Sequence, residues 1–151
     1  HRNFQGYSTQ PDCDLIALGV SAIGKVGATY SQNVKTLEEY YDAIDGGLLP
    51  VQRGLALSRD DMVRRAVIMA VMCQGAVLYE PMEQAWLINF REYFAPEMKA
   101  LEEMQSNGLL TLGEEGFQVT ALGWFFVRGV AMLFDRYLQA DKNRTRFSRI
   151  I

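Results

Sequence analysis

The sequence has little of what most catalytic and metal centres use. Its 151 residues include two cysteines and one histidine, and the histidine is the first residue. No Cys-x-x-Cys or His-Glu-x-x-His motif occurs, and Cys13 and Cys73 lie far apart in the sequence. We therefore expect no metal site, no Ser-His-Asp triad and no catalytic residue within the chain. The two thiols are predicted to be free and buried, as in a cytoplasmic protein.

Long apolar runs and a strong excess of positive charge are also absent. No apolar run reaches the roughly 18–20 residues of a membrane span, and no secretory signal opens the chain. The formal net charge of −3 argues against nucleic acid as a partner, because phosphate binding needs a basic surface. With 49% hydrophobic and 22% charged residues, the composition is that of a globular protein. Because no Met opens the chain and a strand-like pattern begins at once, we expect a segment of a longer protein.

Residues 1–30 do not follow an ordinary amphipathic pattern. The apolar run 15–18 predicts a buried strand. Gly19, Gly24 and Gly27 then indicate a loop in which the backbone bends sharply or approaches another group. A buried strand followed by such a loop is typical of a pocket rim in α/β enzymes. A purely structural crossover is the alternative.

A short helix is predicted over 37–44. Thr36 is placed to cap it, and Glu39, three residues later, completes a capping box. The preceding residues 25–35 are expected to form a polar loop, and 48–54 a linker or an extended strand. This segment precedes the predicted domain boundary, which divides the chain into 1–57 and 58–151.

The second predicted domain is mainly helical. Ser58 is a capping residue, and acidic residues follow it in the first turn of a helix that ends near Gly75. The remaining predicted elements are helices over 82–90, 96–105 and 121–138 and a β-hairpin of 109–112 and 117–120. Three helices, a two-stranded wing and a closing helix indicate a winged-helix-like fold.

A winged-helix outline raises DNA binding as a function, because the helix before the wing commonly enters the major groove. The helix predicted there carries three glutamates and one lysine, and two more glutamates stand at the wing tip. Phosphate groups would repel such a surface. We therefore expect no nucleic-acid partner and no membrane partner.

Read as a motif, the opening stretch resembles a known enzyme family. The residues that carry the resemblance are Arg2–Thr9 (RNFQGYST), Asp14-Leu15, Gly19–Ile23 (GVSAI), Tyr40-Tyr41, Arg53–Asp61, Arg64-Arg65, Gln118–Gly123 and Phe147–Ile151. They resemble the late catalytic region and C-terminal domain of oxygen-independent coproporphyrinogen III oxidase. This is the radical S-adenosylmethionine enzyme of haem biosynthesis.

The resemblance implies a fold and a reaction. The family has an incomplete (β/α) barrel followed by a helical domain. The implied fold is thus mainly α: 58–151 form a winged-helix-like helical domain with a small β-hairpin, and 1–57 are the last α/β piece of the barrel. The implied activity is the oxidative decarboxylation of two propionates of coproporphyrinogen III to vinyl groups, which gives protoporphyrinogen IX. A [4Fe-4S] cluster and S-adenosylmethionine are the implied cofactors of the full-length enzyme.

The resemblance also implies site residues. Gln5 and Ile23 would face S-adenosylmethionine, Phe4 would lie at the same strand end, and Arg2 would meet a substrate carboxylate. The family's Cys-x-x-x-Cys-x-x-Cys motif is absent from this chain. We therefore expect the chain alone to bind no cluster, to be inactive, to need an upstream catalytic region and to self-associate through exposed strand edges. The alternative is a non-catalytic interaction module of winged-helix type or a haem-carrying relative.

Overall fold

The computed structural model of the chain describes residues 2–3, 6–7 and 13–140. It divides into two compact units, one made of Thr9–Met62 and one of His1–Ser8 with Val63–Ile151. We call them the sheet unit and the helical unit. In the helical unit, the two-residue strands β1 (Arg2–Asn3) and β2 (Gly6–Tyr7) pair antiparallel.

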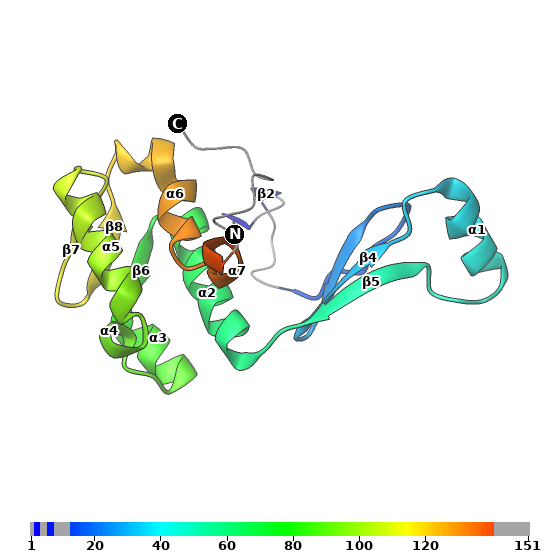
Figure 1. Cartoon of the computed structure of the whole chain (residues 1–151), viewed down its shortest axis with the longest axis horizontal. Coiled ribbons are helices and arrows are strands. Elements are labelled where there is room, and N and C mark those ends of the chain that lie inside the picture. Colours follow the sequence, from blue (N-terminus) through cyan, green and yellow to red (C-terminus); the bar gives the residue numbers. More distant parts are fainter. Residues whose placement is uncertain (1, 4–5, 8–12, 141–151) are drawn as a thin grey trace. The chain divides into compact units, whose positions relative to one another are not determined.

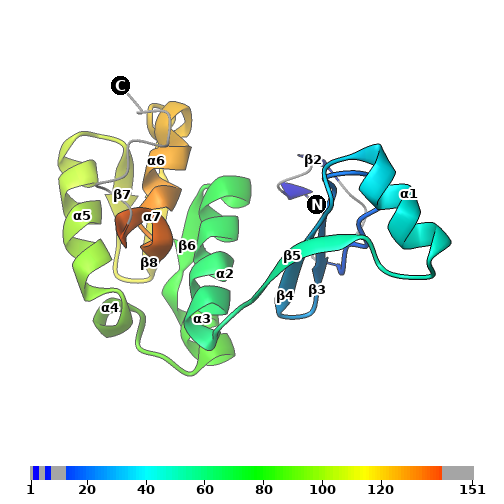
Figure 2. The ribbon, with the colours of Figure 1, turned by 45° about the vertical axis from the view of Figure 1, so that its right-hand side comes forward.

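The sheet unit is a three-stranded antiparallel sheet with one helix. The strands have the order β3-β4-β5. Their bounds are Ile23–Val26, Thr29–Asn33 and Val51–Ala56, and the helix α1 spans Leu37–Asp45 between β4 and β5. In Figures 1 and 2, α1 lies beyond the ends of β4 and β5 and does not cover a face of the sheet. Accordingly, α1 contains no buried residue and every residue of β5 is exposed.

The predicted cap of α1 by Thr36 is confirmed, but Glu39 completes the box through the Thr36 hydroxyl and not through the Thr36 backbone amide. The Thr36 hydroxyl accepts a hydrogen bond from the Glu39 amide at 3.4 Å and donates one to the Glu39 carboxylate at 2.6 Å. After the helix, Gly47 adopts a φ of +71°, which a glycine accepts without strain. Local chemistry therefore sets both ends of this helix.

Two predictions for the sheet unit were wrong. The run 15–18 is not a buried strand: Leu15 makes one isolated bridge to Lys25, and Ile16 and Leu18 are 77% and 82% exposed. Residues 25–35 are not a loop, because they contain the β3–β4 hairpin and its turn at Gly27. Both errors have one cause. The pattern of apolar and polar residues indicates a strand only where one face of the sheet is buried. Among the described residues of this unit, no second layer of structure covers the sheet, so its strands lack that pattern.

The helical unit contains most of the secondary structure. Its helices are α2 (Arg59–Gln74, which starts at the end of the sheet unit's sequence), α3 (Tyr79–Trp86), α4 (Phe90–Tyr93), α5 (Ala95–Ser106), the 3₁₀ helix η1 (Gly123–Phe126), α6 (Val127–Met132) and α7 (Arg136–Ala140). Its second sheet has the order β6-β8-β7, with bounds Ala76–Leu78, Gly116–Val119 and Leu110–Leu112.

The predicted hairpin is confirmed as β7 and β8, which pair antiparallel. The third strand, β6, was not predicted. Gly75 has a φ of +69°, so it ends α2 and turns the chain directly into β6, which pairs with β8. The chain has Ala76-Val77-Leu78 there, a run too short for a periodic signal.

Two helices predicted as continuous are divided. The helix over 82–90 is α3 and α4, because Leu87 takes a left-handed φ of +51° and the Asn89 side chain caps a new helix at Glu92. The helix over 121–138 is η1, α6 and α7. Asp135 caps α7 by accepting from two backbone amides at 3.0 Å each. Ser58 does cap α2, as predicted, through its hydroxyl and the Asp61 amide.

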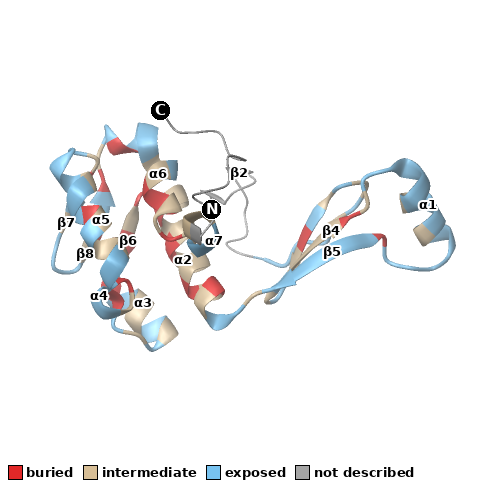
Figure 3. Ribbon diagram, in the orientation of Figure 1, coloured by how far each residue is buried: buried red, intermediate tan, exposed pale blue. Residues whose placement is uncertain are grey.

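The hydrophobic core lies in the helical unit. Among the described residues, the core side chains fall between Val63 and Phe134, whereas the sheet unit contributes the buried Pro50 outside this core. Figure 3 shows buried positions along α2 and α6. The core centres on four phenylalanines, which make consecutive ring contacts with centroid distances of 4.8–6.2 Å: Phe90, Phe94, Phe134 and Phe117. Within the described residues, no helix combines the length and the apolar character that crossing a bilayer requires.

Candidate functional site

The candidate site is the segment of the sheet unit that leads into β3. Ile23, the first residue of β3, is 58% exposed, so its side chain is open to a ligand. It is the one predicted site residue whose side chain the structure describes. Phe4 and Gln5 lie outside the described residues, and for Arg2 only the backbone of β1 is described.

The loop before Ile23, residues 17–22, has an unusual backbone. Gly19 has a φ of +96° and Ser21 a φ of +56°. The left-handed region suits glycine but costs a residue such as serine roughly 1–3 kcal/mol unless surrounding groups hold it there. The loop therefore needs support from its neighbours.

Asn33 supplies part of that support. It is 3% exposed, and its side-chain amide donates to the Gly19 carbonyl at 2.9 Å and to the Ala17 carbonyl at 3.4 Å. Its backbone amide donates to the Ala22 carbonyl at 2.9 Å. One buried residue at the end of β4 thus contacts three carbonyls of the loop.

Tyr40 supports the loop from α1. The Gly19 amide donates to the Tyr40 hydroxyl at 3.0 Å, and the Ser21 amide donates to the Val34 carbonyl at 2.7 Å. Both residues with positive φ are therefore hydrogen-bonded through their amides.

A third chain of contacts runs through the strands. Arg53 in β5 donates twice to the Gln32 side-chain oxygen, at 2.9 and 2.6 Å, and the Gln32 side-chain nitrogen Nε2 donates to the Ser21 carbonyl at 3.2 Å. Gln32 is also the partner of Ile23 in the β3–β4 register. None of these supporting residues was predicted, because their roles depend on pairing between distant segments.

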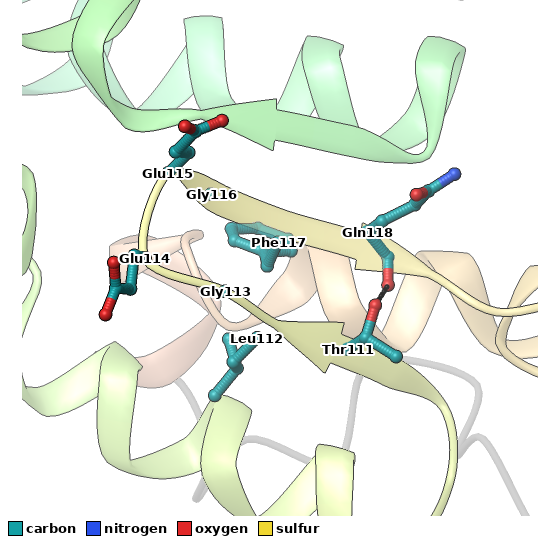
Figure 4. A pocket seen from close by; sticks show the side chains of 8 residues that line it. All are labelled: Thr111, Leu112, Gly113, Glu114, Glu115, Gly116, Phe117 and Gln118. Atoms are coloured by element: carbon teal, nitrogen blue, oxygen red, sulfur yellow. Dashed lines mark hydrogen bonds between the residues drawn. The ribbon is translucent and has the colours of Figure 1, made fainter.

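Two surface pockets in the described part of the helical unit each have a volume of about 430 Å³. One is formed by the β7–β8 hairpin, residues 111–118. Figure 4 shows the Glu114 and Glu115 side chains extending from its turn and a hydrogen bond from Thr111 to the Gln118 carbonyl. The pocket is lined by two carboxylates, with no histidine or cysteine to act as a base or nucleophile.

The second pocket lies beside the start of α3. Its lining includes Tyr79 and Arg91, whose guanidinium stands 5.1 Å from the Tyr79 ring centroid and donates to the Gly113 carbonyl at 2.8 Å. Burial raises the pKa of the Tyr79 hydroxyl above its ordinary value of 10.0, and the nearby Arg91 charge opposes that shift. These contacts are those of packing around a buried ring.

The cysteines and acidic residues form no metal centre in the part of the chain that the structure describes. No group of three or more histidine, cysteine, aspartate or glutamate side chains there could hold an ion. Neither Cys13 nor Cys73 forms a disulfide, but the prediction that both are buried was wrong, because Cys13 is exposed and Cys73 is half-buried.

Comparison with known proteins finds relatives that match the whole length of the chain. Residues 57–126 match the family model described as the HemN C-terminal domain. The oxygen-independent coproporphyrinogen III oxidase of Escherichia coli K12 is 44% identical over 151 residues, which are 100% of this chain and 33% of that protein. The enzyme of the same name from Pseudomonas aeruginosa is 46% identical over 150 residues, 99% of this chain and 32% of that protein.

A solved structure agrees with these matches. It is described as "Coproporphyrinogen III oxidase (HemN) from Escherichia coli is a Radical SAM enzyme" and is 46% identical. It superposes with a TM-score of 0.86 over 91% of this chain and 32% of its own. The chain thus spans about a third of the length of these relatives. In sequence and in fold the chain is similar to a part of the oxygen-independent coproporphyrinogen III oxidases, and its residues 57–126 are similar to the HemN C-terminal domain, which agrees with the resemblance of its motifs.

Proposed function

We propose that this chain acts as the C-terminal part of an oxygen-independent coproporphyrinogen III oxidase. The whole enzyme would convert two propionates of coproporphyrinogen III to vinyl groups, with the loss of two carboxylates as CO₂ and two hydrogens. The observation that carries the proposal is the match of all 151 residues to such an enzyme at 44% identity. The agreement in fold with a radical S-adenosylmethionine enzyme supports it.

The cluster is proposed to lie outside this chain. A [4Fe-4S] centre needs several closely spaced thiolates. Here Cys13 and Cys73 are distant in sequence, and no third cysteine exists. We infer that an upstream region holds the cluster, and that the 151 residues alone neither bind it nor turn over substrate.

We propose that the opening residues and Ile23 form one wall of an S-adenosylmethionine site. When bound, the cofactor supplies the radical that removes a hydrogen from a propionate. The part of this chain is to hold and orient it: Ile23 offers an exposed apolar side chain at the end of a hydrogen-bonded loop. We propose that Gln5 uses its donor and acceptor groups on the cofactor side, that Phe4 flanks it, and that Arg2 meets a substrate carboxylate.

We further propose that 1–57 belong to the catalytic part and 58–151 form the covering domain. The strands β3, β4 and β5 pair antiparallel, whereas the strands of a (β/α) barrel are parallel. In the whole enzyme these three strands would therefore be an addition to the barrel and not part of its parallel sheet. The helix α5 followed by the β7–β8 hairpin supports a winged-helix-like description of the covering domain. Because α5 carries three glutamates and one lysine and the β7–β8 turn carries two more glutamates, we assign this domain no nucleic-acid role. We place the enzyme in the cytoplasm, away from the membrane.

The test uses the full-length enzyme, reconstituted without oxygen. We expect Ile23→Asp and Gln5→Ala to slow the conversion of coproporphyrinogen III and to weaken S-adenosylmethionine binding. For Ile23→Asp, burying a charge at an apolar contact should cost about 2 kcal/mol or more, which is at least tenfold in affinity. Val26→Asp, at the far end of the same strand and 53% exposed, is the matched control.

Full activity in both variants would show that the site assignment is wrong. The sequence upstream of His1 would distinguish the oxidase hypothesis from the alternative, a protein without this activity. A Cys-x-x-x-Cys-x-x-Cys motif there supports the oxidase, whereas its absence would favour a non-catalytic interaction module or a haem-carrying relative.

A further inference from the structure

We propose that Asn33 and Tyr40 are positioning residues for S-adenosylmethionine, which act by holding the 17–22 loop and do not touch the cofactor. The inference rests on the proposed function, in which Ile23 meets the cofactor. It adds two residues outside the opening stretch, one at the end of β4 and one on α1. Neither belongs to the residues 57–126 that match the family model.

The first argument is the chemistry of Asn33. Its side-chain nitrogen lies within hydrogen-bond distance of two carbonyls, those of Ala17 and Gly19, in a site where the residue is 3% exposed. A side-chain amide carries two N–H donors on one nitrogen, so it can serve both carbonyls. An aspartate has the same shape, but its carboxylate oxygen accepts hydrogen bonds and would be repelled by the two carbonyl oxygens. The site therefore selects the amide specifically, and its geometry fixes the loop.

The second argument is the role of α1. This helix buries no residue and does not cover the sheet, so it adds nothing to a core. Yet the Tyr40 hydroxyl accepts the Gly19 amide at 3.0 Å across a separation of 21 residues. The described contact between this helix and the loop is thus a polar one, made at the residue with φ of +96°.

The third argument is how the loop joins β3. Asn33 donates to the Ala22 carbonyl, immediately before Ile23, and the Ser21 amide bonds to Val34. The loop is therefore held on both sides of its two residues with positive φ, directly ahead of the exposed isoleucine. A looser loop would bind a cofactor more weakly, because ordering it would oppose binding.

The experiment compares Tyr40→Phe and Asn33→Asp with Tyr41→Phe. Tyr41 is the neighbouring tyrosine, 57% exposed, which makes the control identical in chemistry. Equilibrium dialysis with S-adenosylmethionine is run on the anaerobically reconstituted full-length enzyme, with iron content measured alongside. We expect a Kd about five- to tenfold higher in Tyr40→Phe and at least about tenfold higher in Asn33→Asp, the scale of one or two hydrogen bonds. Iron content should be unchanged.

Hydrogen exchange of the Gly19 amide in the 151-residue chain gives a readout that needs no cofactor. Exchange should be faster in Tyr40→Phe than in Tyr41→Phe. Wild-type affinity in both loop variants, or an equal loss in Tyr41→Phe, would overturn the inference. A wild-type enzyme that binds no S-adenosylmethionine would overturn the proposed function itself, whatever the exchange data show.

Discussion

Tyr79 shows how a single buried group affects both stability and its pH dependence. The residue is 4% exposed, it stacks on Phe90 with a centroid distance of 4.6 Å, and its hydroxyl has no hydrogen-bond partner within the described part of the chain. Burying a hydroxyl without a partner opposes folding, while burying the ring favours it. The two contributions can be separated by removing the oxygen alone.

We predict that Tyr79→Phe stabilises the protein by about 1 kcal/mol, since it removes an unsatisfied polar atom and keeps the stacked ring. Because the folded-state pKa of Tyr79 is raised above 10.0, the unfolded chain loses this proton first as the pH rises. Stability should therefore fall above pH 10 in the wild type and fall less in Tyr79→Phe. Urea unfolding at pH 7 and above pH 10 measures this. Tyr41→Phe is the exposed control, and an equal pH slope in both variants would contradict the assignment.

The pair of Arg64 and Glu97 is the clearest electrostatic contact of the helical unit. The Arg64 Nη1 lies 2.7 Å from the Glu97 Oε1 and 3.3 Å from the Phe134 carbonyl, with side chains 17% and 12% exposed. We predict that Glu97→Leu costs about 2 kcal/mol, because it removes the carboxylate from a nearly buried guanidinium. A double-mutant cycle with Arg64→Met should show coupling of about 1 kcal/mol or more. Strictly additive effects would mean that the pair contributes nothing.

At the scale of elements, the sequence predicted where helices and turns begin and end better than it predicted whether a helix continues without a break. The predicted helix caps are present at Thr36 and Ser58, and the predicted hairpin turn is present between β7 and β8. The breaks inside the predicted helices depend on Leu87 and on the cap at Asp135. Apolar residues continue across both breaks, so periodicity alone suggested unbroken helices.

Gly123, the first residue of η1, approaches the backbone of Leu109, which immediately precedes β7. A Cβ at this position would collide with the Leu109 carbonyl oxygen and lie 2.8 Å from the Val119 side chain. The Leu109 carbonyl is also held by the Thr120 amide at 3.0 Å, so it cannot move away freely. This segment therefore depends on the absence of a side chain.

We predict that Gly123→Ala destabilises the helical unit by about 3 kcal/mol through steric overlap. Gly129→Ala in α6 is the matched control, because nothing lies within 4 Å of its added Cβ. There the substitution should stabilise by about 0.5–1 kcal/mol, the usual gain in a helix interior. Thermal unfolding followed by circular dichroism compares the two, and equal effects would show that the close approach is unimportant.

At the scale of the whole molecule, the two units differ in how they are stabilised. The helical unit has a continuous apolar core from Val63 to Phe134. The sheet unit is held mainly by strand pairing and by polar contacts around Asn33, and its exposed apolar residues include Leu48, Leu49 and Leu55. A three-stranded sheet whose faces bury few apolar side chains has only marginal stability by itself.

We therefore predict that the 151-residue chain self-associates as its concentration rises, through the sheet unit. Leu49→Glu, at a residue 84% exposed, should shift sedimentation toward the monomer. Leu87→Glu, at an equally exposed residue of the helical unit, is the control. A monodisperse monomer at high concentration would argue against the prediction. So would an equal effect of both substitutions.

The sequence by itself determined the resemblance to oxygen-independent coproporphyrinogen III oxidases, the caps at Thr36 and Ser58, the β7–β8 hairpin and the mainly helical character of residues after 58. These follow from contiguous residues, whose chemistry acts over one turn or one strand. Only the tertiary structure decided that Leu15, Ile16 and Leu18 are exposed, that β6 completes the second sheet and that Asn33 and Tyr40 contact the 17–22 loop. Those features depend on pairing between residues far apart in the chain, and Gly19 and Tyr40 come together only when β3, β4 and α1 have formed.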